Sequence, residues 1–499
     1  MIYRRDTLRP PMEAFWRPLA LCAFMAGAAF ALERLDPFPE DRIQVQPSPA
    51  TLPSTRIIPA RAVAEGMPLL SLVIERDALY DPASGILTHL EERGREWERP
   101  GYISYFAEGR LKLATKTGVR LHGGDSRRYS KAKSYRFYFR SGYGPPALPS
   151  SIFFTTGPAS NLTRVIAHND ARADGDRRLW HLVNPLAYDI ARRLGGITPR
   201  TQPTRFYLNG EPQGVYVLTE QISPEFLEAR FGHRDFSIQE LGDPTRLLGW
   251  ATRTRPFTMD VAAKVVDIDN LTSWALTILF CATTDVLGQS PIVRDRTDPN
   301  ARWFWITWDL DHSFMDLYKS GAEPWLLDSY NTLLYNREGR SRILTRLLRG
   351  DDAYRRYFAR RLSAALNHQL SPAFLEQRYW HYVETALRAG SADSGYSKAL
   401  LRFLRERPRA LWDLTVKHLK TERPATVTVT GPPGSTVDID GYKTVLPYTG
   451  TYLRGTPFLL DAQGASAIGG WRVNGRVTAG VVALDVKEDL HIEAIGPPI

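Results

Sequence analysis

The chain has 499 residues, 43% of them hydrophobic, which is enough for roughly two to four domains with sizeable cores. Its formal charge of +10 comes from arginines spread through the sequence. A solvated basic surface is therefore expected, and nucleic acid is not an expected partner. Zinc-ligand spacings and the motifs G-x-G-x-x-G, Walker A and H-E-x-x-H do not occur. The two cysteines, Cys22 and Cys281, do not identify the redox compartment.

Residues 1–35 have the pattern of a targeting segment. Arginines precede an apolar run, Leu19 to Leu32, which is short for a membrane span, and Ala29-Phe30-Ala31 has the small-x-small form of a signal peptidase site. Export with cleavage after Ala31 is the first interpretation, and an uncleaved signal-anchor attached to the membrane is the second. Both predict a periplasmic, cell-surface or secreted protein. Residues 36–67 are rich in proline without periodicity and are predicted to form a linker.

Folded sequence is predicted from Pro68. Leu69 to Glu75 has the pattern of a buried strand, and Val119 to Leu121 and Tyr135 to Phe139 alternate as strands. A Gly-Gly loop rich in serine and arginine joins the last two strands, and Lys133 enters the second of them. Such a loop can bring backbone N–H groups and one ammonium to phosphates. The alternative is an ordinary hairpin with a basic, solvated tip.

A helix is predicted over Arg177 to Leu194, where apolar residues recur at helical spacing. Asp176 is the expected N-cap, and Gly195-Gly196 is the expected end. Pro185 is predicted either to kink this helix or to lie where its hydrogen-bond ladder is already broken.

A hairpin is predicted next. Arg205 to Leu208 and Val215 to Leu218 flank Asn209-Gly210, a strong turn signal, although the loop is expected to be longer than two residues. Glu220 follows the second strand, where the alternative to a binding role is a surface carboxylate at a strand end.

The stretch from Cys281 to Phe314 carries the main candidate residues. A helical run, Ile268 to Leu279, leads to Asp285 in a short loop, and a strand-like run from Trp303 to Trp308 ends at Asp309 and Asp311. Two residues apart, these carboxylates would share one face of a strand and could reach one hard cation. Phosphoryl transfer needs one carboxylate for the hydroxyl proton and another for Mg²⁺. The alternative is that Asp309 and Asp311 only cap a strand end.

The remaining sequence changes from a helical to a β-strand pattern at Glu422. Residues 342–420 carry three apolar or aromatic stripes at helical spacing, which predict core helices. Residues 423–499 are β-patterned, with a hairpin signal at Trp471 to Gly475, and predict a small all-β accessory module without chemistry. His491 in this module is predicted to be structural.

Several ordered segments resemble the CotH family, the spore-coat-type atypical protein kinases. They are GREWERP, RLHGGDSR, KSYRFYFRSGYG, the helix with its flanks HNDARADGDRRLWHLVNPLAYDIARRLGGITPRT, the hairpin FYLNGEPQGVYVLTEQI and WITWDLDHSF. The resemblance covers Pro68 to about Ser320, with a weaker helical continuation to about Glu422. It implies an α+β fold with a two-lobed, protein-kinase-like domain over residues 68–422. The first lobe would be β-rich and the second helical.

The resemblance also implies site residues and cofactors. Asp285 would orient the acceptor hydroxyl and take its proton, and Asp309, with Asp311 close by, would hold Mg²⁺ or Mn²⁺. Lys133 would contact the phosphates of ATP, Ser126 would lie in the phosphate loop, and Glu220 would lie near the nucleotide.

Two features depart from the family pattern. The family commonly places an asparagine a few residues after the catalytic aspartate as a further metal ligand, and Gln289 or Ser290 stands there. The predicted helix contains no glutamate to pair with Lys133, so that one of the aspartates near or within it would have to serve: Asp170, Asp174, Asp176 or Asp189.

The predicted function is an exported atypical kinase that transfers a phosphoryl group from ATP to serine or threonine of surface or envelope proteins. The alternative is a catalytically weak or inactive kinase-like scaffold that acts as a binding or structural protein of the cell surface. A third hypothesis, an enzyme acting on envelope glycans, would use Asp285 and Asp309 as its carboxylate pair.

Overall fold

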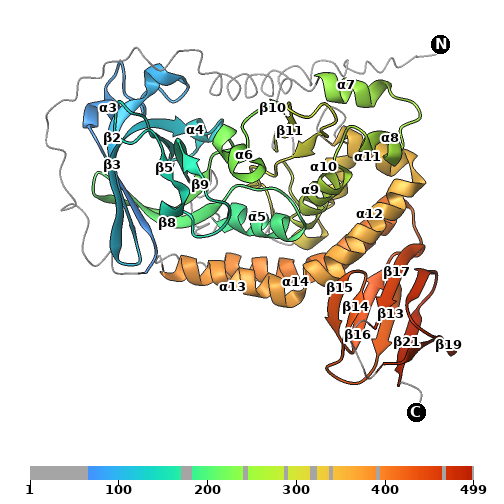
Figure 1. The fold of residues 1–499 in the computed structure, drawn as a ribbon. Helices are drawn as coiled ribbons and strands as arrows, with labels where there is room; N and C mark the ends of the chain where they lie inside the picture. Colours follow the sequence, from blue (N-terminus) through green and yellow to red (C-terminus); the bar gives the residue numbers. More distant parts are fainter. Residues whose placement is uncertain are drawn as a thin grey trace, which may run out of the picture.

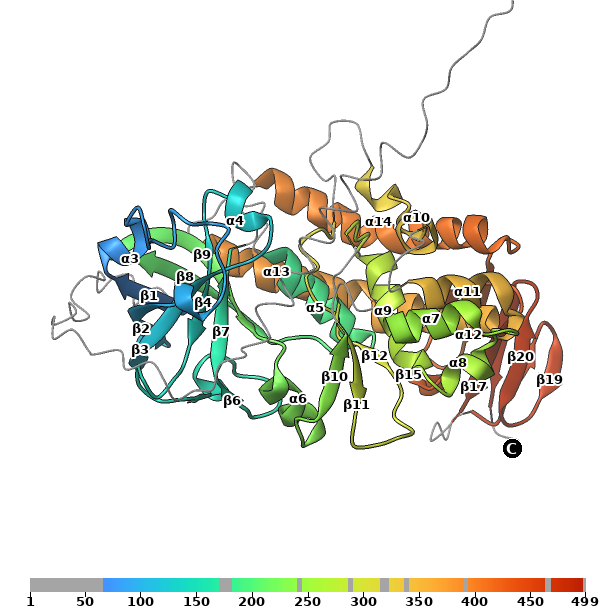
Figure 2. The same ribbon diagram turned by 90° about the horizontal axis from the view of Figure 1, so that it is seen from above.

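The computed structural model describes residues 66–169, 182–239, 245–285, 290–314, 323–335, 341–388, 394–462 and 468–496. A closed β-barrel lies at one end, helices lie in the middle, and two further β-sheets lie at the other end (Figure 1, Figure 2). Residues 1–65, which cover the predicted targeting segment and nearly all of the predicted linker, lie outside the described residues. Within the described ranges, no helix combines the length and hydropathy that a membrane crossing requires.

The barrel closes in the strand order β1-β2-β3-β4-β7-β9-β8, and only the closing pair, β1 with β8, is parallel. Inward-facing residues such as Leu72, Val119 and Phe137 are fully buried in its core. The three strands predicted in this part of the sequence are confirmed within β1, β3 and β4. The barrel strands are β1 (Leu69–Ile74), β2 (Arg99–Ala107), β3 (Arg110–His122), β4 (Ser134–Tyr138), β7 (Arg164–His168), β8 (Thr201–Leu208) and β9 (Glu211–Glu220).

Short elements decorate the barrel. They are α3 (Arg76–Tyr80), η3 (Arg95–Trp97), α4 (Ser126–Tyr129), β5 (Leu148–Pro149), η4 (Ser150–Ile152) and β6 (Asn161–Leu162).

The predicted hairpin is β8–β9, but its loop is only Asn209-Gly210, so the expectation of a longer loop is wrong. Both residues have positive φ, 50° and 88°, as a two-residue hairpin turn requires. The first residues of β9 continue the ladder through an irregularity at Phe206/Tyr207, and this continuation shortens the loop. The Asn209 side chain also bonds both backbone groups of Ile74, which ties the turn to β1.

Helix α9 (Ile268–Phe280) lies at the centre of the helical region and contacts α5, α8, α10, α11, α12 and α14. Its residues are almost all buried, and Asp267 caps its N-terminus by accepting the N–H of Asn270 at 2.9 Å. The helix predicted before Asp285 is therefore confirmed. The stripes predicted over residues 342–420 are also confirmed, because they face this core from α11, α12 and α13.

The other helices of this region are α5 (Val183–Arg193), α6 (Pro224–Phe231), α7 (Thr245–Arg253), α8 (Met259–Ala263), η6 (Pro324–Leu326), α10 (Ser329–Tyr335), α11 (Arg342–Gly350), α12 (Asp352–Ala364), η7 (Ala365–Gln369), α13 (Pro372–Arg388) and α14 (Ser394–Leu419).

Helix α5 follows the prediction from Val183 onward, and the predicted part before Leu182 lies outside the described residues. Pro185 is its third residue, in the first turn, where a missing N–H breaks no intrahelical bond. The helix ends at Arg193, and Gly195 follows with φ +88°. The predicted N-cap, Asp176, lies outside the described residues.

A three-stranded sheet joins the barrel to the helices. It consists of β10 (Phe236–Gln239), β11 (Ile292–Asp295) and β12 (Phe304–Trp305), and it packs through Val293 and Ile306 against Ile166 of β7. The strand predicted over residues 303–308 is thus much shorter. After Trp305 the pairing continues only as an isolated parallel bridge between Ile306 and Ile197, to whose carbonyl the N–H of Thr307 donates, and the extended backbone ends at Asp309.

Every described element from Ala425 onward is a strand. One sheet has the order β16-β13-β21-β18-β19 and the other β15-β14-β17-β20, with an apolar core between them that includes Trp471. The predicted hairpin at Trp471 to Gly475 is β18–β19. The strands are β13 (Ala425–Thr430), β14 (Thr436–Ile439), β15 (Tyr442–Val445), β16 (Tyr448–Tyr452), β17 (Thr456–Asp461), β18 (Gly470–Val473), β19 (Arg476–Thr478), β20 (Val482–Val486) and β21 (Leu490–Ile495).

Candidate active site

The two chain segments that lead to Asp285 and away from Asp311 pair with each other. The N–H of Phe314 donates to the carbonyl of Cys281 at 2.7 Å, and the N–H of Thr284 donates to the carbonyl of His312 at 3.2 Å. These bonds align the segment after α9 antiparallel to the segment after β12. Asp285 and Asp311 are the next residues of the two segments in this register. A buried hydroxyl pair, Thr283 with Ser313 at 2.7 Å, fixes the same register.

Asp309 and Asp311 lie in a turn and not on one face of a strand, so that part of the prediction is wrong. Asp309 has φ +58°, which breaks the extended backbone. Helix α5 holds the turn: the N–H of Asp309 donates to the Tyr188 hydroxyl at 3.0 Å, and the N–H of Leu310 donates to Asn184 Oδ1 at 2.7 Å. The turn is therefore positioned by side chains on a helix and not by a strand ladder.

The carboxylates differ in exposure. Asp285 and Asp309 are half-buried, and Asp311 is buried. Burial, followed by the negative charges of Asp309 and Asp311, raises the pKa of Tyr188 well above its ordinary value. The Tyr188 hydroxyl therefore stays neutral and remains available as a hydrogen-bond partner for the turn.

Three basic side chains lie close together on strands β3, β4 and β7 of the barrel. His168, at the end of β7, is half-buried; burial lowers its pKa and the charge of Asp311 opposes that shift. Its ring lies 5.7 Å from that of His122 at the end of β3. Burial and the neighbouring charge of Arg136 lower the pKa of His122, so its neutral Nδ1 accepts Arg136 Nη2 at 2.6 Å. A guanidinium and two imidazoles thus lie together on the outer face of β3, β4 and β7.

The predicted phosphate loop, residues 123–133, is closed on itself. Ser126 opens the short helix α4, and a Cβ on Gly123 (φ +109°) would lie 2.2 Å from its hydroxyl oxygen, so only glycine fits. The Lys133 ammonium donates to the carbonyl of Arg127 at 2.7 Å and to that of Ser130. Lys133 therefore holds the shape of this loop. Its predicted contact with ATP phosphates, and that of Ser126, stay predictions.

Glu220 is fully buried at the end of β9, so the alternative of a surface position is wrong. Its carboxylate pairs with Arg200 at 2.6 Å and with Arg230 at 2.8 Å. Burial alone would raise the pKa of Glu220, but its bonds to the two arginines outweigh this and lower the pKa. The carboxylate is already neutralised, which argues for a structural role that joins β9, the start of β8 and α6. A nucleotide contact by Glu220 stays a prediction.

Several predicted partners fall elsewhere. Gln289, the predicted metal ligand, lies outside the described residues, as do Asp170, Asp174 and Asp176. Asp189 is not a partner of Lys133, because it pairs with Arg192 and Arg378 and accepts the Tyr382 hydroxyl at 2.7 Å.

The carboxylates of Asp309 and Asp311 suit a divalent cation that is also coordinated by a bound ligand. No group of three or more histidine, cysteine, aspartate or glutamate side chains suited to a metal occurs among the described residues. Mg²⁺ is commonly held by one or two carboxylates while substrate phosphates and water complete its shell. Asp309 and Asp311 fit that requirement.

Sequence reasoning missed Asn184, Tyr188, His122, Arg136 and His168. One signal was available: Asn184 and Tyr188 are four residues apart and share a helix face, where two polar groups interrupt an apolar pattern. The barrel residues gave no such signal, since each lies outward on a different strand and the three meet only when β3, β4 and β7 pair side by side.

Comparisons with known proteins identify a family for the chain. The sequence model of a family described as "CotH kinase protein" matches residues 119–254 and 251–421. A crystal structure of a Helicobacter pylori proinflammatory kinase, CtkA, is similar over 53% of this chain and 94% of that chain, at 11% identity and a TM-score of 0.29. That similarity is too low to carry an argument about the site. A search of curated proteins finds no match.

Proposed function

Because this chain belongs to the CotH kinase protein family, whose model matches more than half of it, we propose that it is an atypical kinase. It transfers a phosphoryl group from ATP, with Mg²⁺ or Mn²⁺, to serine or threonine side chains of surface or envelope proteins. In this proposal the barrel is the first lobe of a kinase-like domain, the helices form the second lobe, and the strands after Ala425 form an accessory module.

One observation supports the proposal: hydrogen bonds pair the segment Cys281–Thr284 with the segment His312–Phe314, and Asp285 and Asp311 are the next residues of this pairing. A second observation is electrostatic: the charge of Asp311 acts on the pKa of His168 at the end of β7, whose ring lies near that of His122. Acidic groups opposite cationic groups suit a ligand that carries both a metal ion and phosphates.

The chain's residues divide the chemistry between them. Asp285 accepts the proton of the acceptor hydroxyl while the hydroxyl oxygen bonds to the γ-phosphorus and the bond from that phosphorus to the ADP oxygen breaks. Asp309 and Asp311 would hold a divalent cation, which would neutralise phosphate charge. Tyr188 and Asn184 fix the turn that carries them, and Arg136 supplies positive charge from the barrel.

One observation favours the scaffold alternative. Lys133 and Glu220, which the resemblance assigns to the nucleotide, are engaged within the fold, Lys133 with loop carbonyls and Glu220 with two arginines. A protein that kept the architecture as a cell-surface binding scaffold would tolerate this. Export itself rests on the targeting pattern of residues 1–35 and is part of the proposal.

Phosphate incorporation tests the activity. The purified protein is incubated with labelled ATP and Mg²⁺ or Mn²⁺, alone and with envelope proteins. Asp285→Ala and Asp309→Ala should each reduce incorporation by about 100-fold or more while circular dichroism remains that of the parent. Asp260→Ala, an exposed carboxylate on α8, is the matched control and should leave incorporation unchanged. Full activity in both site variants would contradict the proposal.

A further inference from the structure

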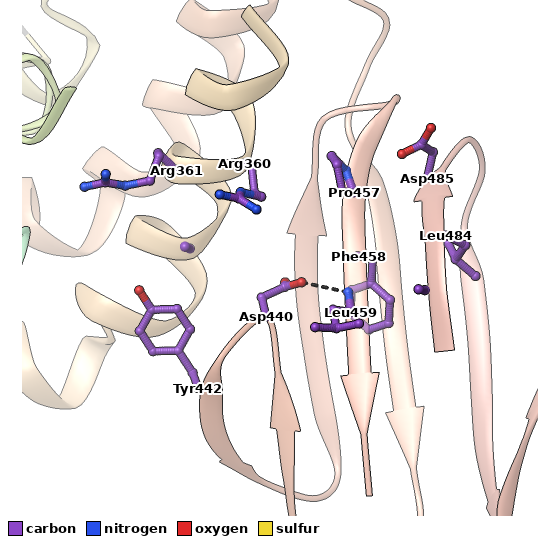
Figure 3. Close-up of a pocket in the computed structure, with 11 residues that line it drawn as sticks. Arg360, Arg361, Asp440, Tyr442, Pro457, Phe458, Leu459, Leu484 and Asp485 are labelled. Carbon is purple, nitrogen blue, oxygen red and sulfur yellow. Dashed lines mark hydrogen bonds between the residues drawn. The ribbon is translucent and has the colours of Figure 1, made fainter. Parts of the chain in front are cut away.

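A groove separates helix α12 from the second C-terminal sheet. It has a volume of about 630 Å³ and is lined by α12, the β14–β15 turn, β17 and β20 (Figure 3). This volume is within the usual range of about 300–1,000 Å³ for ligand sites. None of its lining residues belongs to the proposed kinase site, so the groove has no part in the proposed kinase chemistry.

The walls of the groove are fixed against each other. The Asn367 amide bonds both backbone groups of Thr451, at 2.9 and 3.0 Å, as a neighbouring strand would. The His368 ring stacks on Tyr442 at 4.8 Å and on Tyr448 at 5.4 Å. Leu453 is buried in the core of the helical region. The groove is therefore preformed, which reduces the ordering cost of binding.

Opposite charges lie on the two walls. Arg360 on α12 and Asp485 on β20 are both exposed, and neither has an ion-pair partner among the described residues. Two other charged residues of the lining are engaged. Arg361 points away from the strands and bonds Asp269 at 2.6 Å, and Asp440 accepts the N–H of Leu459 at 2.8 Å (Figure 3).

The floor between these charges is apolar. Leu459 is 42% exposed, high for a leucine, and lies opposite Ala483 in the ladder. Pro457 lies opposite Asp485 in the same ladder. A ligand that matches the whole groove has an aliphatic middle, an anionic group toward Arg360 and a cationic group toward Asp485.

We propose that this groove binds an extended peptide segment of a partner protein, in which aliphatic residues separate an acidic and a basic side chain. A peptide supplies this alternation directly, and the aliphatic contact with Leu459 and Pro457 would add burial to the two charge contacts. The proposal does not rest on the kinase activity and can fail or succeed independently of it.

Fluorescence anisotropy on the full chain tests this proposal. The probes are capped, labelled peptides with two leucines between a glutamate and a lysine, in both orders and with several spacers, beside versions with serine in place of leucine. We expect saturable binding of at least one leucine peptide and weaker binding of its serine version. Arg360→Glu and Leu459→Ser should each weaken binding by about fivefold or more. Arg360→Glu should then prefer the peptide in which lysine replaces glutamate.

The matched control is Arg356→Glu, which reverses an exposed charge one turn earlier on α12, outside the groove lining. It should bind like the parent. All the substituted side chains are exposed, so the variants should fold, and circular dichroism checks this. The proposal is overturned if no peptide of the series binds saturably, or if Arg360→Glu and Leu459→Ser bind as the parent does.

Discussion

Replacing Tyr188 by phenylalanine removes the hydroxyl that accepts the N–H of Asp309 at 3.0 Å. Tyr188 is only 2% exposed, so water cannot readily replace the lost partner, and the expected loss of unfolding free energy is about 1–3 kcal/mol. The loss falls on a turn whose Asp309 already has an unfavourable positive φ. We therefore expect ATP·Mg²⁺ to bind about tenfold more weakly, which corresponds to about 1.4 kcal/mol.

The assay combines chemical denaturation with calorimetric titration of ATP·Mg²⁺. Tyr330→Phe is the control, since Tyr330 is equally buried and its hydroxyl bonds Thr415 at 2.8 Å, within the helical core. It should lose similar stability and bind the nucleotide as the parent does. If Tyr188→Phe and Tyr330→Phe lose the same stability and both bind within about twofold of the parent, the Tyr188 contact supports the fold and not the site.

Three further substitutions test other parts of the structure. Glu220→Gln leaves two buried arginines without their carboxylate and should lower the free energy of unfolding in urea by about 3–5 kcal/mol. Because the pKa of Glu220 is lowered in the folded state, this difference in unfolding free energy between the parent and the variant should shrink as the pH falls below about 4.5. Burial lowers the pKa of His368 to about 4 in the folded protein, so that His368 is protonated at a higher pH in the unfolded chain than in the folded one. The free energy of unfolding should therefore fall by about 1–2 kcal/mol between pH 7 and pH 5. His368→Phe should show a shallower fall, and an unchanged slope would contradict this. Gly123→Ala, at φ +109° and against the Ser126 hydroxyl, should lower the melting temperature, whereas Gly124→Ala, with open space in front of it, should have a smaller effect.

Local patterns predicted the elements that lead to the site. Helix α9 was predictable because its apolar residues recur at helical spacing and its cap is a local contact between Asp267 and Asn270. The β8–β9 hairpin was predictable from Asn209-Gly210, although the strand irregularity that shortens its loop was not. These features depend on residues close together in the sequence.

The geometry of the site depends on contacts between distant residues and escaped prediction. The alternation of tryptophans before Asp309 indicated a strand through residue 308, but the hydrogen bonds of Asp309 and Leu310 to Tyr188 and Asn184 hold a turn that directly follows it. Lys133 had the right position in the sequence for a phosphate contact, yet carbonyls in its own loop hold its ammonium. No local pattern records which polar group a buried backbone N–H will find.

The central proposal, a shared site for a nucleotide and a divalent cation at Asp285, Asp309 and Asp311, is tested most directly by one titration. ATP·Mg²⁺ is titrated calorimetrically into the parent protein, Asp309→Ala and the control Asp260→Ala. We predict saturable binding to the parent and the control and binding at least about tenfold weaker to Asp309→Ala. No binding to the parent, or equal binding to all three folded proteins, would contradict the proposal.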